Sequence, residues 1–467
     1  MLTFEPISLK CATRLRQYYR TCTYRLCEYS VGVKLMWRDH WKPEYAESHG
    51  CLIVKNHSRH FGPLFDYPVP LPGEGDVEAA LDAIDSWCLE QGVAPAFGVV
   101  PEEELESLLQ RYPYARVDRA RIWQDYLYRT EDLASFAGRR YSGQRNHINK
   151  FRKLYPQAVC RALTPEDAGA VEAFWEEFHR VFHKEDAMAR KELCAARKLM
   201  RQVGKRWVKA GCVELEGKLL AIALGEVCGN TLVCHIEKGL PQYEGVYPVM
   251  VQSFAAANGE GTAWINREDD AGDRGLRTSK LQYLPADMGA KIRLIARNEL
   301  AGLEEIPLLR SRRLTLDAIQ EEDKPDYNRL CLDDECNRWW GYDYRQDLKG
   351  ELTEDYFLEV ARRDFQNRLA VNFAIRLEGR YIGEAVLYRF DCRGGAELGC
   401  RILPEFAGNG YGAEAFQRAA EWSLYELGLY CLHAKCFHEN AASRRMLESC
   451  MRPSGEDESF FYFEKKV

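Results

Sequence analysis

The sequence has 467 residues, of which 46% are hydrophobic and 29% are charged, a composition typical of an ordinary soluble globular protein. At roughly 150 residues per domain, this length suggests about three domains. The formal net charge is -7. The overall field therefore gives no attraction to nucleic acid or to an anionic membrane, and a partner of that kind would need a local basic patch.

Seventeen cysteines are scattered singly along the chain, and no two of them form a C-x-x-C pair. We therefore expect no zinc or other metal site. The N-terminal segment MLTFEPISLKCATRL lacks the basic, apolar and small-residue order of a signal peptide, and no apolar run approaches the roughly 20 residues of a membrane span. These features predict a reduced, cytoplasmic protein with no integral membrane segment, and they leave its oligomeric state open.

A basic stretch, GRRYSGQRNHINKFRKLYP, runs from Gly138 to Pro156 and contains six Lys or Arg and no acidic residue. Ser142 is expected to cap a helix here, and Pro156 to end it. Helical spacing predicts an apolar face and an opposite basic face. The apolar face consists of Ile148, Phe151 and Tyr155. The candidate contacts to a phosphate-rich partner on or beside the basic face are Arg145, Asn149, Arg152 and Lys153. A merely solvated helix face would have the same pattern.

The middle of the chain predicts a mixed sheet with interleaved helices. Two antiparallel strand pairs lie in AGCVELEGKLLAIALGEVCGNTLVCHIEKGL, followed by the helix YPVMVQSFAAAN, the strand AWIN, the helix GLRTSKLQYL and the strand KIRLIA. The strand AWIN ends at Asn266 and a charged loop follows. Candidate substrate contacts there are Asn266, Arg267, Arg277 and Lys280. The alternative is a salt-bridged loop that packs two modules together, and His147 and His235 are expected to be hydrogen-bonded structural residues.

The basic stretch and WINREDDAGDRGLRTSKLQYLP, at Trp264 to Pro285, resemble the soluble C-terminal domain of phosphatidylglycerol lysyltransferases, over about residues 1–297. The resemblance implies two acetyltransferase-like folds in tandem and, as in the best-known members, an aminoacyl-tRNA donor and a lipid acceptor. The membrane flippase segment of those enzymes is not found in this sequence, so a lipid is only one of the acceptors left open, with a peptide amine, a small amine and an antibiotic. The loop GLPQYEGV has no Gly-x-Gly cradle for a diphosphate, so the tandem is expected to use aminoacyl-tRNA or to be non-catalytic.

The clearest domain boundary is RNELAGLEEIPLLRSRR, Arg297 to Arg313, after which RLTLDAIQEEDKPDYNRLC restarts as a strand and a helix. A weaker boundary lies near Tyr128 to Phe136. We therefore predict that residues 1–130 and 131–297 form the two halves of the tandem, that 298–312 form a linker, and that 313–467 form a separate domain.

In the last domain, GCRILPEFAGNGYGAEAFQRAAEWSL, from Gly399 to Leu424, predicts a strand, a glycine-rich turn and a helix. Such a turn exposes backbone N–H groups beside the positive helix end and suits a phosphate or diphosphate. A Walker A loop is excluded because no Gly-Lys-Ser/Thr follows. The letters from Gly408 to Ala413 match G-x-G-x-x-G/A, but the loop follows an antiparallel hairpin and LYCLHAKCF offers no acid to a ribose. A tight turn without a ligand is the alternative.

Three motifs in this domain occur together: NRWWGYD, then AELGCRILPEFAGNGYGAEAF, then HENAASRRMLES. They resemble GNAT N-acetyltransferases, in particular the subgroup that acetylates ribosomal-protein N-termini, over about Arg313 to Lys465. The resemblance implies acetyl-CoA as cofactor and a peptide or small-molecule amine as acceptor. Ala407 stands where the family loop has Arg or Gln, while Gly410 and Gly412 match. Because backbone donors supply most of the diphosphate contacts, we expect weaker binding and not its loss.

The resemblance also implies roles for individual residues. Glu397 would act as a general base that accepts a proton from the substrate ammonium through water, and Ser443 would protonate the departing thiolate. The strand backbone would pair with pantetheine and donate an N–H to the oxyanion. The implied cofactor-binding residues are Cys400, Ile402, Leu403, Ala407, Gly408, Asn409, Gly410, Tyr411, Gly412 and Asn440. Alternatively, Asn440 only caps its helix and Glu397 is a plain strand carboxylate.

Together these features predict an α+β protein with three acetyltransferase-like modules, each a mixed, largely antiparallel twisted sheet flanked by helices. The predicted function is acyl transfer, with acetyl-CoA as donor in the last module and an aminoacyl or acyl transferase-like tandem before it. The rival hypothesis is a non-catalytic RNA- or ligand-binding tandem followed by a degenerate CoA-binding domain.

Overall fold

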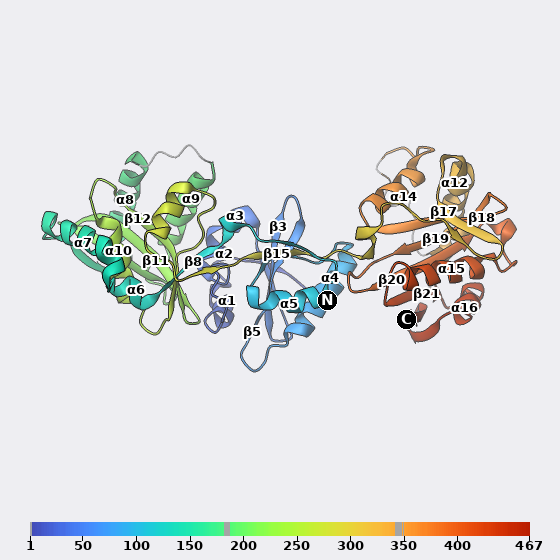
Figure 1. Ribbon diagram of the computed structural model, residues 1–467, viewed down its shortest axis with the longest axis horizontal. Helices are drawn as coiled ribbons and strands as arrows, with labels where there is room; N and C mark the ends of the chain where they lie inside the picture. The colour runs from blue at the N-terminus through green and yellow to red at the C-terminus, as the bar shows by residue number, and fades with distance from the viewer. Residues whose placement is uncertain (1, 182–186, 341–347, 349) are drawn as a thin grey trace. The chain divides into compact units, whose positions relative to one another are not determined.

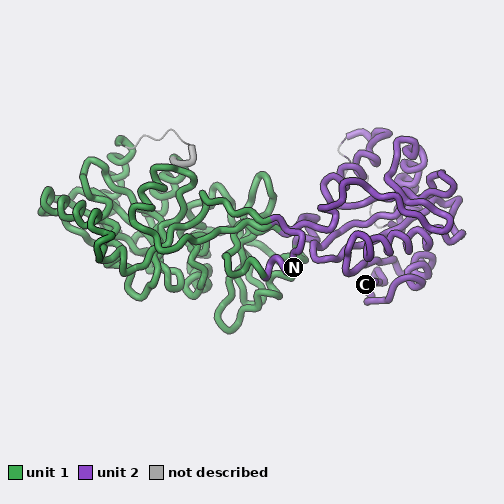
Figure 2. The backbone as a smooth tube through the Cα atoms, viewed as in Figure 1, with its two compact units in different colours: residues 1–87, 96–106, 117–294 green, residues 88–95, 107–116, 295–467 purple. Residues whose placement is uncertain are grey.

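A computed structural model describes residues 2–181, 187–340, 348 and 350–467 of the chain. The chain divides into two compact units (Figure 2). Unit 1 comprises residues 1–87, 96–106 and 117–294, and unit 2 comprises residues 88–95, 107–116 and 295–467. The described residues form three sheets flanked by helices, which confirms the α+β class. Every helix in those residues is too short or too polar to cross a bilayer.

The first sheet has the strand order β1-β2-β3-β4-β6-β15-β7, with β5 paired to β3. Its strands are β1 (Glu5–Pro6), β2 (Glu44–Ser48), β3 (Cys51–Ser58), β4 (Gly62–Asp66), β5 (Val69–Pro70), β6 (Ala96–Val100), β7 (Arg116–Asp118) and β15 (Ile292–Ile295). The helices in this part of the chain are α1 (Ala12–Tyr19), α2 (Val31–Met36), α3 (Arg38–Trp41), α4 (Val77–Gln91) and α5 (Leu105–Arg111). Strand β15 thus returns to this sheet from far along the chain.

The second sheet has the order β14-β8-β13-β12-β11-β10-β9. Its strands are β8 (Asp125–Arg129), β9 (Val159–Ala162), β10 (Lys209–Leu215), β11 (Lys218–Cys228), β12 (Thr231–Gly239), β13 (Trp264–Asn266) and β14 (Asp287–Gly289). Its helices are α6 (Thr130–Ser135), α7 (Ser142–Leu154), α8 (Ala168–Val181), α9 (Ala187–Met200), α10 (Val246–Asn258) and α11 (Arg274–Leu281). The first two sheets therefore interleave in sequence, and the proposed boundaries at 130 and 297 stay predictions.

The basic stretch forms helix α7, and its predicted apolar face packs into the core of the second sheet. Ile148 and Phe151 are buried there, and Tyr155 packs beside them. The expectation for Ser142 is wrong. The helix begins at Ser142 itself, and the residue before it, Tyr141, makes no side-chain capping bond.

The third sheet has the order β16-β17-β18-β19-β20-β21-β23-β22. Its strands are β16 (Leu309–Arg310), β17 (Leu314–Ala318), β18 (Ala370–Leu377), β19 (Arg380–Tyr388), β20 (Gly395–Ile402), β21 (Cys431–Phe437), β22 (Arg452–Glu456) and β23 (Phe460–Lys466). Its helices are α12 (Lys324–Leu332), α13 (Asp334–Trp340), α14 (Tyr356–Gln366), α15 (Tyr411–Tyr425) and α16 (Ala441–Glu448). Helices α12 and α14 cover one face, and α15 covers the other (Figure 1).

Two of the sheets contain parallel neighbours that pair only briefly. Strands β20 and β21 pair over three positions, from Gly395 with Cys431 to Glu397 with His433, and β20 then continues to Ile402 paired only with β19. Strands β12 and β13 likewise pair from Thr231 to Val233, after which β12 continues to Gly239. We call these two places the β20–β21 splay and the β12–β13 splay. A splay leaves backbone groups on the facing strand edges without their ladder partners, and those groups need another partner.

Candidate functional site

The β20–β21 splay opens into a cavity of about 1270 Å³ in unit 2. One wall is β20 from Leu398 to Ile402, and the facing wall is β21 from Ala434 to Phe437. Helices α13 and α14 border the cavity on one side of the sheet, and the first turns of α15 and α16 border it on the other. The cavity therefore passes between the two strands where their ladder ends.

The glycine-rich loop brings the N-terminus of α15 to this cavity. Gly408 and Gly410 have φ values of 79° and 78°, in the left-handed region that glycine adopts without steric cost. Gly410 immediately precedes α15, and the cavity wall includes Gly410, Tyr411 and Gly412. The first backbone N–H groups of a helix have no partners within the helix and carry its positive dipole end. This end of the cavity is therefore suited to an anionic group.

Arg313 places a guanidinium, ion-paired with Glu414, beside the loop. Its Nε lies 2.7 Å from Oε2 of Glu414, and its Nη1 donates to the carbonyl oxygen of Asn409 at 3.1 Å. Its guanidinium also lies 4.5 Å from the centre of the Tyr411 ring. The chain thus supplies an arginine at the loop that begins with Ala407, but from a distant position in the sequence.

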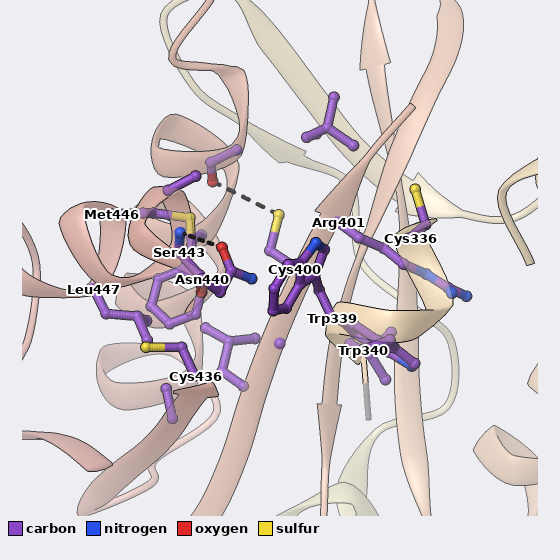
Figure 3. Close-up of a pocket in the computed structure, with 18 of the residues that line it drawn as sticks. Cys336, Trp339, Trp340, Cys400, Arg401, Cys436, Asn440, Ser443, Met446 and Leu447 are labelled. Atoms are coloured by element: carbon purple, nitrogen blue, oxygen red, sulfur yellow. Dashed lines mark hydrogen bonds between the residues drawn. The ribbon is translucent and has the colours of Figure 1, made fainter. Parts of the chain in front are cut away.

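Asn440 and Ser443, at the start of α16, line the cavity on the same side of the sheet as the start of α15, and Figure 3 shows them beside Cys400. Asn440 caps the helix, because its Oδ1 accepts a hydrogen bond from the backbone N–H of Ser443 at 3.0 Å. This is the capping role that the sequence indicated. The cap fixes the first turn, which holds the Ser443 side chain at the cavity wall.

The tryptophans of helix α13 lie on the opposite side of Cys400 from α16 (Figure 3). The Trp340 ring packs directly on Gly399, since a Cβ at that position would lie 2.8 Å from the ring. The Arg401 guanidinium lies 4.7 Å from the centre of the same ring. Glycine at position 399 is therefore required for this close approach. Of the NRWWGYD motif, residues 341–343 lie outside the described residues.

Glu397 lies on the cavity wall at the last paired position of the splay. Its Oε1 is 3.0 Å from Nε of Arg389. Its cross-strand neighbour is Tyr388, and burial, together with the charge of Glu397, raises the pKa of the Tyr388 phenol above its ordinary value. At neutral pH the tyrosine is therefore a neutral hydroxyl beside an ion-paired carboxylate.

The cysteines of the cavity are poor nucleophiles. Burial raises the pKa of Cys400 to about 12, and burial and the neighbouring Asp333 raise that of Cys336 to about 12. Burial also raises the pKa of Cys436. Since the thiolate and not the thiol is the nucleophile, these cysteines are protonated and unreactive at neutral pH.

The structure gathers most of the residues singled out in unit 2 around the cavity. Those that line it are Glu397, Cys400, Ile402, Ala407, Gly408, Gly410, Tyr411, Gly412, Asn440 and Ser443. Two are not among the lining residues. Leu403 is buried in a second core cluster, and the Asn409 side chain donates to the carbonyl oxygens of Phe406 and Ala407. Any contact of these two with a ligand would have to come from the backbone.

The β12–β13 splay in unit 1 is bridged by ion pairs. Nε of Arg267, just after β13, lies 2.7 Å from Oε2 of Glu237 on β12. His235 on β12 lies between two carboxylates, with Nδ1 2.9 Å from Glu268 and Nε2 3.0 Å from Glu226. All five side chains are largely buried. Charged side chains thus connect the diverging strands here, where unit 2 has an open cavity.

The chain segment before and within α2 lies against this bridged splay. The backbone N–H of Gly32 donates to Oε1 of Glu226 at 2.6 Å, and a Cβ on Gly32 would overlap the His235 ring. Asn266 is fully buried, and its Nδ2 donates to the Arg25 carbonyl at 2.6 Å. Asn266 therefore anchors the N-terminal segment to the second sheet.

A buried lysine adds to this junction within unit 1. Nζ of Lys291 lies 2.9 Å from Glu28, 2.8 Å from Asp125 and 2.9 Å from Asp269. Cys27, Glu28 and Asp125 lie close enough together to ligate a metal. However, the lysine ammonium is within 3.2 Å of all three groups, so it already occupies the position of a cation.

The other predicted substrate contacts of unit 1 make internal bonds. Arg277 binds Asp270 through Nε at 2.9 Å and Nη2 at 3.0 Å. Nζ of Lys280 donates to the carbonyl oxygens of Arg267 and Glu268 at 2.6 and 3.2 Å. These bonds agree with the alternative reading of the sequence, in which the loop after Asn266 is held by internal salt bridges. A role of these residues in substrate binding stays a prediction.

The basic helix α7 keeps three of its four predicted contacts at the surface. Asn149, Arg152 and Lys153 are exposed, and Arg152 borders a cavity of about 420 Å³ between α7 and α10. Arg145 instead donates to the carbonyl oxygens of Phe136 and Gly138. The Arg145 guanidinium is thus used in hydrogen bonds to its own backbone. Binding of a phosphate-rich partner by helix α7 stays a prediction.

Comparison with known proteins identifies both units. Residues 19–294, more than half of the chain, match the family model for the C-terminal domain of phosphatidylglycerol lysyltransferase. The chain belongs to this family. Residues 313–450 match the GNAT acetyltransferase domain, so unit 2 carries such a domain. Both resemblances seen in the sequence motifs are confirmed.

Individual relatives of this lysyltransferase-family protein each cover a share of the chain. A crystal structure of a conserved protein of unknown function from Bacteroides thetaiotaomicron is 25% identical, with a TM-score of 0.58, and the match covers 64% of this chain and 100% of that chain. An uncharacterized N-acetyltransferase, YoaA, of Bacillus subtilis is 25% identical over 30% of this chain and 80% of its own length. An uncharacterized protein of Mycoplasmoides gallisepticum is 23% identical over 39% of this chain and 58% of its own length.

The bridged splay predicts a pH-dependent stability. Burial alone would lower the pKa of His235, but its hydrogen bonds with Glu226 and Glu268 raise it to about 9. A raised pKa in the folded state stabilises the protein fully below the unfolded value of about 6.5, and this contribution is lost as the pH rises through about 9. The full contribution is on the order of 3 kcal/mol.

The test compares thermal unfolding of the full chain between pH 6.5 and 9.5 for the wild type, for His235→Gln and for a control, His433→Gln, which changes an exposed histidine. We expect the unfolding midpoint to fall with pH in the wild type and the control more steeply than in His235→Gln. Parallel curves for all three proteins would show that the His235 bridge does not contribute.

Proposed function

We propose that unit 2 transfers an acetyl group from acetyl-CoA to an amine at the β20–β21 splay. The observation that carries this proposal is the geometry of the splay, in which an unpaired strand edge, a cavity and a helix N-terminus meet in a GNAT domain. The rival hypothesis is a degenerate domain that binds CoA weakly or not at all, and isothermal titration with acetyl-CoA separates the two.

The residues at the cavity fit the parts of acetyl-CoA. The diphosphate would bind the loop from Gly408 to Gly412 and the N-terminus of α15, with Arg313 supplying the side-chain cation that Ala407 lacks. The pantetheine arm would pair with the β20 edge beyond Leu398, which has no strand neighbour on that side. Asn440 and Ser443 would face the sulfur end from α16.

The bound cofactor supplies an acetyl thioester, and the chain supplies the proton transfers. Glu397 would accept a proton from the ammonium through water, leaving the free amine to form the new N–C bond. Backbone N–H groups of β20 would stabilise the oxyanion. The Ser443 hydroxyl would protonate the sulfur as the C–S bond breaks, and the second proton that the nitrogen loses on becoming an amide would return to the Ser443 oxygen. Because the cavity cysteines are protonated, the amine would attack the thioester directly, without an acyl-cysteine intermediate.

We further propose that unit 1 does not take an acyl-CoA in its own splay, because Arg267, Glu237, His235 and Glu268 fill that position. The exposed basic side chains of α7 could contact phosphates, so aminoacyl-tRNA is one partner to test for unit 1.

The cofactor site is tested by Gly410→Val. At φ 78° a valine would distort the loop that leads into α15, so we expect the affinity for acetyl-CoA in isothermal titration to fall at least tenfold. Gly379→Val is the matched control, because Gly379 has a similar φ of 84° with open space around it and does not line the cavity. Equal affinities of both variants and the wild type would place the cofactor elsewhere.

The proton donor is tested by Ser443→Ala. Loss of a general acid should lower kcat by on the order of a hundredfold, while the Kd of acetyl-CoA changes little because the proton is needed mainly in the transition state. Thiol release from acetyl-CoA is measured with a mixture of peptide and small amines. Ser449→Ala, at the other end of α16, is the control. An unchanged kcat in Ser443→Ala would remove this serine from the mechanism.

A further inference from the structure

Lys435, on strand β21, presents an ammonium group at the surface of the unit 2 cavity. Its side chain is exposed and lines the cavity wall. Nζ lies 4.8 Å from the centre of the Phe460 ring, which belongs to the same wall. Within the part of the chain that the structure describes, no carboxylate forms an ion pair with it. An ammonium that rests on an aromatic ring still has its N–H donors for another partner.

Strand alternation places Lys435 on the α13 side of the sheet. Its neighbours in sequence, Ala434 and Cys436, belong to the core cluster that packs against α15, so Lys435 faces the other way. Phe437 has the same orientation as Lys435, because its ring lies 6.1 Å from the ring of Trp339 on α13. The glycine-rich loop and the start of α16 border the cavity on the α15 side. Lys435 therefore faces away from the groups proposed to hold the cofactor.

The register of the sheet places Lys435 just past the end of the β20–β21 ladder. The last pair of this ladder is Glu397 with His433, and paired residues point to the same face of a sheet. Lys435 is two residues beyond His433, so it is the next side chain on that face of β21. Lys435 and the proposed base Glu397 thus border the same opening from facing strands.

The other charged side chains on this side of the cavity wall form ion pairs, with one exception among the described residues. The pairs are Glu397 with Arg389, Arg363 with Asp364, and Arg401 with Glu384. The exception is Glu335, on the first turn of α13. The last turn of that helix, with Trp339 and Trp340, is the part that contacts β21 and β20. Of the two unpaired charges, Lys435 is therefore the one at the splay.

We propose that the amine acetylated by unit 2 carries a carboxylate near its nitrogen, and that Lys435 is the specificity-determining residue that binds this carboxylate. The inference rests on the proposed function and adds the chemical class of the acceptor. A neutral acceptor would cover the ammonium without giving it a partner, which is unfavourable, whereas a carboxylate forms a charge-assisted hydrogen bond with it. The carboxylate belongs either to a free amino acid or to an acidic residue next to a peptide N-terminus.

The experiment measures kcat and KM of the full chain with acetyl-CoA and two sets of acceptors. The peptides Ala-Asp-Ala, Ala-Asn-Ala and Ala-Arg-Ala, all as C-terminal amides, differ only in the second side chain. Alanine and alaninamide differ in the α-carboxylate. The proteins are wild type, Lys435→Gln, Lys435→Glu and a control, Lys465→Glu. Lys465 is a lysine of the neighbouring strand β23 that does not line the cavity.

We expect the wild type to have a KM for the Asp peptide about fivefold below that for the Asn peptide, as for an ion pair at a partly exposed site, with similar kcat. Lys435→Gln should remove this difference, and Lys435→Glu should reverse it, so that the Arg peptide has the lowest KM. Lys465→Glu should keep the wild-type order. Each peptide brings the same amine to every protein, so the comparison between proteins isolates the side chain at position 435.

The same order of KM in wild type and Lys435→Glu would overturn the inference. A preference for alanine over alaninamide that is lost in Lys435→Gln assigns the carboxylate to a free amino acid, and the corresponding result with the peptides assigns it to an acidic residue. Dependence on Lys435 in neither set would overturn the inference, as would binding of acetyl-CoA without acetylation of any carboxylate-bearing probe.

Titration of every variant with acetyl-CoA separates the two levels of the account. If the wild type does not bind acetyl-CoA, the proposed function fails. If acetyl-CoA binds and the neutral acceptors are acetylated equally well by wild type and both Lys435 variants, with no preference for a carboxylate, only the carboxylate subsite fails.

Discussion

The arrangement of unit 2 depends on the early end of the ladder between β20 and β21. After Glu397 the two strands lose their common hydrogen bonds, and the β20 edge, the α15 N-terminus and the α16 cap all meet at the resulting gap. An unpaired backbone edge is unfavourable unless something else satisfies it, and the proposed pantetheine arm would supply those hydrogen bonds.

Unit 1 contains the same divergence between β12 and β13 but resolves it differently. Arg267 and His235 connect the strands through carboxylates, and Lys291 and Asn266 connect the second sheet to the segment that precedes α2. Buried charges are tolerable only when they are paired and hydrogen-bonded, and here nearly every charge has a partner from a different element. The result ties the first and second sheets into one compact unit, in agreement with the single family match over residues 19–294.

The sequence predicted those features that depend on local pattern. Three features follow from residues a few positions apart: the glycine-rich turn, the apolar face of α7 and the Asn440 cap. Both family resemblances were likewise carried by short contiguous motifs. His235 was expected to be a hydrogen-bonded structural residue, and it is one. The prediction that Ser142 caps helix α7 was wrong. A residue type that favours the cap position can also lie at the first position inside a helix.

The parts that could not be predicted depend on strand register and on distant segments. Strand alternation indicates which residues share a face, but not that Asn372, Glu384 and Arg401 meet across three strands. Likewise, no spacing rule connects Arg313 to the loop at Asn409, or Arg267 to Glu237 across a splay.

The central claim is that one splay of this chain is an open cofactor site and the other is closed by its own side chains. The most direct test is the stoichiometry of acetyl-CoA binding to the full chain, measured by isothermal titration at a protein concentration well above Kd. The account predicts one acetyl-CoA per chain. Two per chain would contradict the closure of the β12–β13 splay, and none would contradict the cofactor site in unit 2.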